Sequence, residues 1–139
     1  MLHHMKLKES PFIKIRNGSK TIELRLNDEK RQQVQVGDFI EFSLLDNPTE
    51  KIQTRVTALH HFNSFQELYA SLPKEKLGYS SSDTPNPDHM DEYYPREKQE
   101  QYGVLGIELR MTELQKFIDA QEHGYSFGET YQTALAEMK

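Results

Sequence analysis

The stretch SPFIKIRNGSKTIELRL, residues 10–26, places signals for a helix, a turn and a strand directly after one another. Ser10 can cap a helix by accepting a backbone hydrogen bond, and Pro11 suits the first helical position, where a missing N–H is not needed. Gly18 suits the left-handed exit from a helix. The segment therefore predicts a helix from about Pro11 to Asn17.

Beyond Gly18 the sequence alternates strictly between polar and apolar side chains, which predicts a strand with one core face and one polar face. A polar strand face can be simply the solvated side of a sheet, or it can be the wall of a cleft. The apolar positions are Ile22, Leu24 and Leu26, and the polar positions are Thr21, Glu23 and Arg25.

Two separated motifs resemble the ASCH domain family, a branch of the PUA-like β-barrels. The first is GSKTIELRL at residues 18–26, followed by DEKR and VGDFIEF, and the second is YYPREKQEQYGVLGIEL at residues 93–109. The likeness extends in matching order from about Met5 to Leu109. It implies an α+β fold, namely a PUA-like small mixed β-barrel flanked by short helices.

The resemblance also implies a function. It implies a basic cleft beside the first helix that binds RNA, a nucleotide or a nucleoside, and this is the leading prediction. Certain members of the family hydrolyse the amide of acetylated cytidine, so the alternative is an amidohydrolase acting on an acetylated nucleoside such as N4-acetylcytidine. Whether the chain is an enzyme stays open at this point.

The candidate site centres on three charged residues of the opening stretch. Lys20 and Arg25 offer cationic donors suited to a phosphate or a developing oxyanion, while Glu23 can accept a hydrogen bond from a base edge or take a proton from water. The opposing interpretation is an ordinary surface pair of Glu23 and Arg25, worth under about 1 kcal/mol. The full predicted binding set is Lys14, Lys20, Thr21, Glu23, Arg25, Tyr94 and Glu97.

The catalytic assignment carries over only in part. In the amidohydrolase branch, a Lys-x-x-Thr spacing supplies the lysine and the threonine nucleophile. Lys20 matches that lysine, but Glu23 stands in the threonine position and Thr21 lies one residue after the lysine. Lys20 and Glu23 are therefore the catalytic candidates only if the chain is hydrolytic, and the substitution favours binding. Tyr94 and Glu97 enter through the match to the YY-x-x-E part of the second motif.

Composition narrows the class of protein. The chain has 139 residues, which suits one domain, a net charge of −5 and no cysteine. Disulfides and thiolate chemistry are excluded, and an acidic chain is not expected to coat nucleic acid with its whole surface, so any such contact must be local.

No cofactor or metal site is predicted, because the pairs His3-His4 and His60-His61 project to opposite strand faces. We expect neither a signal peptide nor a membrane span, and we therefore expect a cytoplasmic location.

The remaining elements follow from local patterns. A segment from Pro73 to Asp91 lacks any period, and it is expected to form a mobile loop bordering the cleft. Ser64 and Glu67 have capping-box spacing at the start of a helix over residues 64–71. Further predicted elements are strands at Met5–Lys8, Phe39–Leu45, Lys51–His60 and Val104–Leu109, with a hairpin joining the second and third, and a helix at Pro95–Tyr102.

A C-terminal helical extension, residues 111–139, is expected to pack on the domain formed by residues 1–110. Thr112 with Gln115, and Ser126 with Glu129, each have capping-box spacing, which predicts two helices. They are expected to cover a sheet edge, or alternatively to form a homodimer contact.

Overall fold

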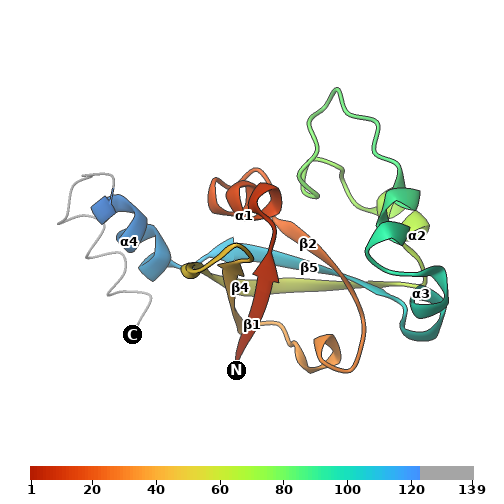
Figure 1. Cartoon of the computed structure of the whole chain (residues 1–139), viewed down its shortest axis with the longest axis horizontal. Helices are drawn as coiled ribbons and strands as arrows, with labels where there is room; N and C mark the ends of the chain where they lie inside the picture. Colours follow the sequence, from red (N-terminus) through yellow and green to blue (C-terminus); the bar gives the residue numbers. More distant parts are fainter. Residues whose placement is uncertain (123–139) are drawn as a thin grey trace.

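The computed structural model describes residues 1–122 and shows a five-stranded mixed sheet curved into a half-barrel (Figure 1). This confirms the predicted α+β class and the PUA-like barrel. The strand order is β1-β3-β4-β5-β2, with β1 parallel to β3 and the other neighbours antiparallel. The strands are β1 (Leu2–Leu7), β2 (Ile22–Leu26), β3 (Phe39–Leu44), β4 (Asn47–Phe62) and β5 (Val104–Met111).

Four α-helices and two short 3-10 helices surround the sheet within the described residues. Figure 1 shows α2 and α3 at one end of the sheet and α4 at the other. The α-helices are α1 (Glu9–Arg16), α2 (Phe65–Ser71), α3 (Arg96–Tyr102) and α4 (Glu113–Glu122), and the 3-10 helices are Arg31–Gln33 and Pro87–Glu92.

Helix α1 begins two residues earlier than the sequence predicts. The backbone N–H of Phe12 donates to the carbonyl of Lys8 at 3.1 Å, so Lys8 takes the N-cap position, where its side chain makes no cap hydrogen bond. The prediction that Ser10 caps this helix is wrong, because Ser10 lies inside the first turn. Pro11 is tolerated there because the first N–H groups of a helix have no intrahelical partner. Gly18 adopts a φ of +83°, as the turn requires.

Two apolar clusters hold the fold together. The larger fills the half-barrel with side chains from α1, β1, β3, β4 and β5, including the fully buried Phe42 and Ile107. The smaller lies between β2 and α2, where Ile22 packs among Phe65 and Leu68. The predicted apolar face of β2 is therefore buried, but against α2 rather than inside the larger cluster.

The predicted hairpin between the third and fourth strands is confirmed, with a two-residue turn at Leu45-Asp46. Strand β4 is longer than expected and starts at Asn47, before Pro48. A register shift between Ser43 and Leu44 accommodates this start. The long β4 serves two partners, because its first half pairs with β3 and its second half with β5.

The segment 73–91 is more structured than its composition indicates. Leu77 is buried, and the carbonyl of Lys76 accepts the backbone N–H groups of Thr21 and Ile22, both at 2.9 Å. The 3-10 helix Pro87–Glu92 closes the segment. The expectation of a stretch without structure is corrected by these contacts, since one apolar residue and a few backbone bonds tie the segment to β2.

The cap predicted for α4 is confirmed, because the Thr112 hydroxyl accepts the backbone N–H of Gln115 at 3.1 Å. Hydrogen bonds tie the start of this helix to β4, beyond the end of β5. The backbone N–H of Gln53 donates to the side-chain oxygen of Gln115 at 2.8 Å, and the backbone carbonyl of Gln53 accepts the N–H of Thr112 at 3.2 Å. The helix predicted around Ser126 and Glu129 lies outside the described residues, and the homodimer stays a prediction. Within residues 1–122, no helix is long and apolar enough to cross a membrane.

Candidate functional site

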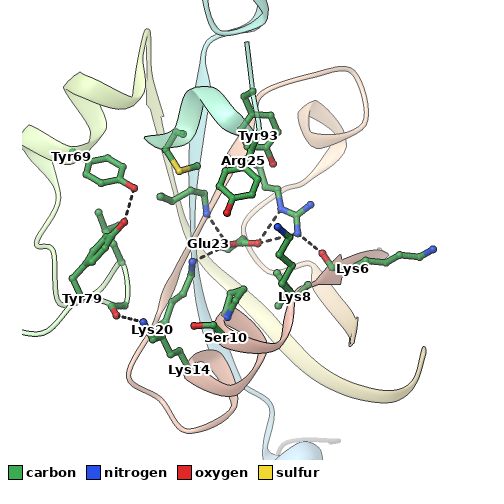
Figure 2. Close-up of a pocket in the computed structure, with 17 residues that line it drawn as sticks. Lys6, Lys8, Ser10, Lys14, Lys20, Glu23, Arg25, Tyr69, Tyr79 and Tyr93 are labelled. Atoms are coloured by element: carbon green, nitrogen blue, oxygen red, sulfur yellow. Dashed lines mark hydrogen bonds and ion pairs between the residues drawn. The ribbon is translucent and has the colours of Figure 1, made fainter. Parts of the chain in front are cut away.

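A pocket of about 360 Å³ lies where the end of β1, helix α1, strand β2 and the segment 73–94 meet (Figure 2). Its wall carries five cationic side chains and four tyrosines, but one carboxylate, that of Glu23. The cations are Lys6, Lys8, Lys14, Lys20 and Arg25, and the tyrosines are Tyr69, Tyr79, Tyr93 and Tyr94.

Glu23 is the centre of the pocket's polar network. Its Oε1 atom lies 3.1 Å from Lys20 Nζ and accepts the backbone N–H of Leu24 at 3.1 Å, while Oε2 lies 3.1 Å from Arg25 Nε and 3.0 Å from Arg25 Nη2. The side chains of Glu23, Lys20 and Arg25 are only 7%, 11% and 12% exposed. The interpretation of Glu23 and Arg25 as a solvated surface pair is therefore wrong.

The charge state of Glu23 follows from these contacts. Burial raises the pKa of Glu23, but the charges of Lys20 and Arg25, with hydrogen bonds from Lys20 and the Leu24 N–H, outweigh burial and hold it below its usual value. Glu23 is thus ionised at neutral pH. An ionised carboxylate with a lowered pKa is a weak base, and here it orients two cations.

Arg25 also connects two strands that are not neighbours in the sheet. Its Nη2 atom donates to the backbone carbonyl of Lys6 at 2.8 Å, which joins β2 to the end of β1. These strands occupy the two ends of the strand order. Arg25 is therefore fixed by a carboxylate on its own strand and by a carbonyl on another, which leaves its guanidinium with a defined orientation at the pocket.

Gly78 holds the segment 73–91 close to two of the lysines. Its carbonyl accepts a hydrogen bond from Lys14 Nζ at 3.0 Å. Gly78 has a φ of +100°, and a Cβ atom there would lie 3.3 Å from Cβ and Cδ of Lys20 and 3.4 Å from Cδ of Lys14. The lack of a side chain therefore allows the segment to pack directly on the aliphatic parts of both lysines.

The tyrosines divide into packed and exposed groups. Tyr94 stacks on Phe65 with 5.7 Å between ring centroids, and burial raises its pKa. Tyr93 is 55% exposed, and Lys8 Nζ lies 4.8 Å from the centroid of its ring. The Tyr69 and Tyr79 hydroxyl oxygens are 3.0 Å apart. Tyr94 thus supports the pocket wall, whereas Tyr93 is exposed at the rim with the Lys8 ammonium over its ring.

The structure brings most of the predicted site residues together. Lys14, Lys20, Glu23, Arg25 and Tyr94 all line the pocket. Two predicted residues lie apart from it, since Thr21 is absent from the pocket wall and Glu97 is exposed on α3.

The predicted set leaves out other residues of the pocket wall, among them Lys6, Lys8, Tyr69, Tyr79 and Tyr93. Lys6 and Lys8 belong to the cluster of basic residues near the start of the chain, which was a usable signal. No sequence signal identifies Tyr69 and Tyr79, because a tyrosine on the apolar face of a helix or in a loop is ordinarily a packing residue.

The chain resembles known proteins in sequence and in fold. The family model of the ASCH domain matches residues 5–113. The crystal structure of the hypothetical protein PH0355 is 29% identical, with a TM-score of 0.68, over 80% of this chain and 99% of that one. The solution structure of protein PF0455 from Pyrococcus furiosus is 30% identical, with a TM-score of 0.61, over 80% of this chain and 97% of that one.

A more distant structure shares the fold. The crystal structure of a serine-to-alanine mutant of an ASCH protein from Zymomonas mobilis is 14% identical, with a TM-score of 0.56, and the match covers 78% of this chain and 67% of that one. No functionally curated protein matches the chain significantly. With an ASCH match over most of its length and a half-barrel shared with these structures, the chain belongs to the ASCH domain family.

Proposed function

We propose that this protein binds a nucleotide, either free or as an unpaired nucleotide of an RNA, in the pocket beside α1. The observation that carries the proposal is the charge of the pocket wall. Five cationic side chains face one carboxylate there, although the chain as a whole carries a net charge of −5. Such a local concentration of positive charge on an acidic protein favours an anionic ligand at this place.

The donors that remain suit a phosphate group. Lys20 uses one of its three N–H groups on Glu23, and Arg25 Nη1 makes no hydrogen bond to any residue from 1 to 122. Because Glu23 fixes both cations, little conformational entropy is lost when they bind an anion. Lys8, at the exposed rim, adds a third positive charge.

The exposed face of Tyr93 suits a nucleobase. Stacking of one unpaired base on an aromatic ring is worth roughly 1 to 3 kcal/mol. Lys8 lies over this ring, and a base that stacks on the same face would displace its ammonium group towards the sugar-phosphate backbone of the nucleotide. A pocket of about 360 Å³ suits one nucleotide better than a duplex.

The test is a binding titration of fluorescently labelled single-stranded RNA and of mononucleotides at low and moderate salt. We expect Lys8→Gln to weaken RNA binding and to reduce the salt slope by about one, because one phosphate contact is lost. Lys30→Gln is the matched control, since Lys30 is exposed and lies outside the pocket wall. Tyr93→Ala should weaken binding with little change in salt slope.

Two results would contradict the proposal. One is the absence of any binding to RNA or nucleotides at low salt. The other is equal weakening by Lys8→Gln and Lys30→Gln, which would place the contact outside the pocket. Lys20→Ala and Arg25→Ala should also weaken binding, but their stability must be measured alongside because each removes one of the two cations that neutralise Glu23.

The amidohydrolase alternative is favoured by one observation, the direct contact of Lys20 with Glu23 in a pocket. Against it, Glu23 has a lowered pKa and both of its oxygens already accept hydrogen bonds, so it is poorly suited to take a proton from water. Incubation with N4-acetylcytidine and chromatography for cytidine distinguishes the two functions. Release of cytidine that Glu23→Gln abolishes would establish the hydrolytic one.

A further inference from the structure

We propose that the pocket has two anion subsites, one on each side of Glu23, and that its ligand is a nucleotide with phosphate on both its 5′ and its 3′ oxygen. This inference rests on the proposed nucleotide-binding function and adds to it the number and the separation of the phosphates. A nucleotide of this kind exists free, as a 3′,5′-bisphosphate, and as every internal nucleotide of an RNA strand.

Glu23 divides the cations of the pocket into two groups. Its Oε1 atom lies 3.1 Å from Lys20 Nζ, while its Oε2 atom lies 3.1 Å from Arg25 Nε and 3.0 Å from Arg25 Nη2. Figure 2 shows Lys14 and Lys20 on one side of this carboxylate and Lys8 and Arg25 on the other. All four side chains line the same pocket.

The first subsite is formed by Lys14 and Lys20. A Cβ atom at Gly78 would lie 3.3 Å from Lys20 Cδ and 3.4 Å from Lys14 Cδ, so both side chains pass the same point of the segment 73–91. Lys14 Nζ donates to the Gly78 carbonyl at 3.0 Å, and Lys20 Nζ contacts Glu23. An ammonium group has three donors, so each lysine is held by one contact and retains donors for a phosphate.

The second subsite is formed by Arg25 and Lys8. The contacts of Arg25 with Glu23 and with the Lys6 carbonyl, which is 2.8 Å from Nη2, hold the guanidinium in one orientation. Lys8 follows two residues after Lys6, and its Nζ atom lies 4.8 Å from the centroid of the Tyr93 ring. A phosphate in this subsite therefore leaves the base next to Tyr93, on which the proposed function stacks it.

A single phosphate does not satisfy both subsites. Lys20 and Arg25 lie against different oxygens of Glu23, so a phosphate midway between them would face the carboxylate itself. The lowered pKa of Glu23 keeps it ionised at neutral pH, and like charges in a partly buried site repel each other strongly. Two phosphates separated by a ribose avoid this repulsion, because each lies beside its own cations and the neutral sugar lies next to Glu23.

Two isomeric ligands test the separation of the phosphates. Uridine 3′,5′-bisphosphate and uridine 5′-diphosphate have the same base, the same sugar and the same number of phosphates, but only the bisphosphate places the ribose between them. Calorimetric titration at low salt should show the bisphosphate binding about ten times more tightly, because it alone forms charge-assisted hydrogen bonds in both subsites.

One substitution in each subsite tests where the phosphates bind. Lys8→Gln and Lys14→Gln should each bring the ratio of the two affinities towards one, since the bisphosphate then keeps one complete subsite, as the diphosphate does. Lys30→Gln, outside the pocket, is the control and should leave the ratio unchanged. A substitution that merely disturbed the segment 73–91 would weaken both ligands and keep their ratio.

A trinucleotide of uridine distinguishes the two sources of the ligand, because its middle nucleotide carries both phosphates within a strand. Binding at least as tight as that of the bisphosphate, despite the lower charge of the two diesters, would assign the subsites to RNA. Loss of measurable binding would assign them to the free bisphosphate.

The outcomes separate this inference from the proposed function. Equal affinities of the natural protein for the two isomers, or a ratio that neither Lys8→Gln nor Lys14→Gln changes, would overturn the inference and leave nucleotide binding intact. No binding of any of these nucleotides would overturn the proposed function, and the inference with it.

Discussion

Replacing Glu23 by glutamine tests whether the network at the pocket stabilises the fold. Glutamine keeps the shape of the side chain but removes its charge. Lys20 and Arg25, whose side chains are 11% and 12% exposed, are then left as like charges near each other without the carboxylate between them. Removing one partner of a buried ion pair costs about 3 to 5 kcal/mol.

The lower end of that range applies here, because both cations reach the open pocket and can gain water. We therefore expect Glu23→Gln to lower the free energy of unfolding by about 3 kcal/mol at pH 7. For a domain of this size the melting temperature should fall by about 10 °C. Urea unfolding followed by far-ultraviolet circular dichroism measures the first quantity, and thermal unfolding measures the second.

The pH dependence of this difference is a second part of the same test. The pKa of Glu23 is lowered from 4.5 on folding, so its contribution to stability is fully present above that value and is lost as the pH falls through the folded pKa. The gap in stability between the natural protein and Glu23→Gln should thus be constant near neutral pH and shrink below 4.5. Glu97→Gln, at an exposed position, is the matched control. A variant within about 0.5 kcal/mol of the natural protein at pH 7, the size of an ordinary surface substitution, would refute the reasoning.

Three further substitutions test other parts of the structure, each measured by urea unfolding. Gly78→Ala should cost more than Gly18→Ala, since both glycines have a positive φ but only Gly78 has side-chain atoms within 4 Å of the added Cβ; equal costs would contradict the packing described. Ser64→Ala should cost about 1 kcal/mol by removing the N-cap oxygen of α2, and no loss would show that the cap is dispensable. Ile107→Ala should cost about 2 to 5 kcal/mol because the side chain is fully buried, whereas Ile13→Ala, at a position 48% exposed, should cost far less.

The sequence predicted those parts of the fold that depend on neighbouring residues. Alternation located β2, Gly18 marked the turn before it, and Ser64 marked the start of α2. Helix α1 was misplaced at its start because two residues with cap-like chemistry, Ser10 and Pro11, lie inside the first turn of a helix that begins from a backbone bond to Lys8. A side chain suited to a cap does not oblige the helix to begin there.

The burial of Glu23 could not be predicted from the sequence. Alternation shows that Glu23 and Arg25 share a face of β2, but whether that face is covered depends on segments distant in the chain. The covering comes from α1 and from residues 77–94, the second of which has no period and a polar composition. Its attachment depends on Leu77 and on the Lys76 carbonyl, neither of which stands out in the sequence.

The dependence on distant segments also explains which residues of the pocket the sequence identified and which it missed. The family likeness selected Lys14, Lys20 and Arg25, which all line the pocket, since these residues lie inside the first motif or in the helix before it. It also selected Glu97, which lies on the exposed surface of α3. Tyr69 and Tyr79 were missed because their meeting depends on the path of the chain between them.

The bond from Arg25 to the Lys6 carbonyl has a mechanical consequence. The two outermost strands of the sheet, β1 and β2, do not pair with each other, so the half-barrel is open between them, and the Arg25 side chain joins one strand to the other at the pocket. A ligand held by Arg25 and Lys8 would act as a second fastener across the same gap. Ligand binding should therefore stabilise the contact between β1 and β2. The expected sign is slower amide hydrogen exchange in both strands when the pocket is occupied.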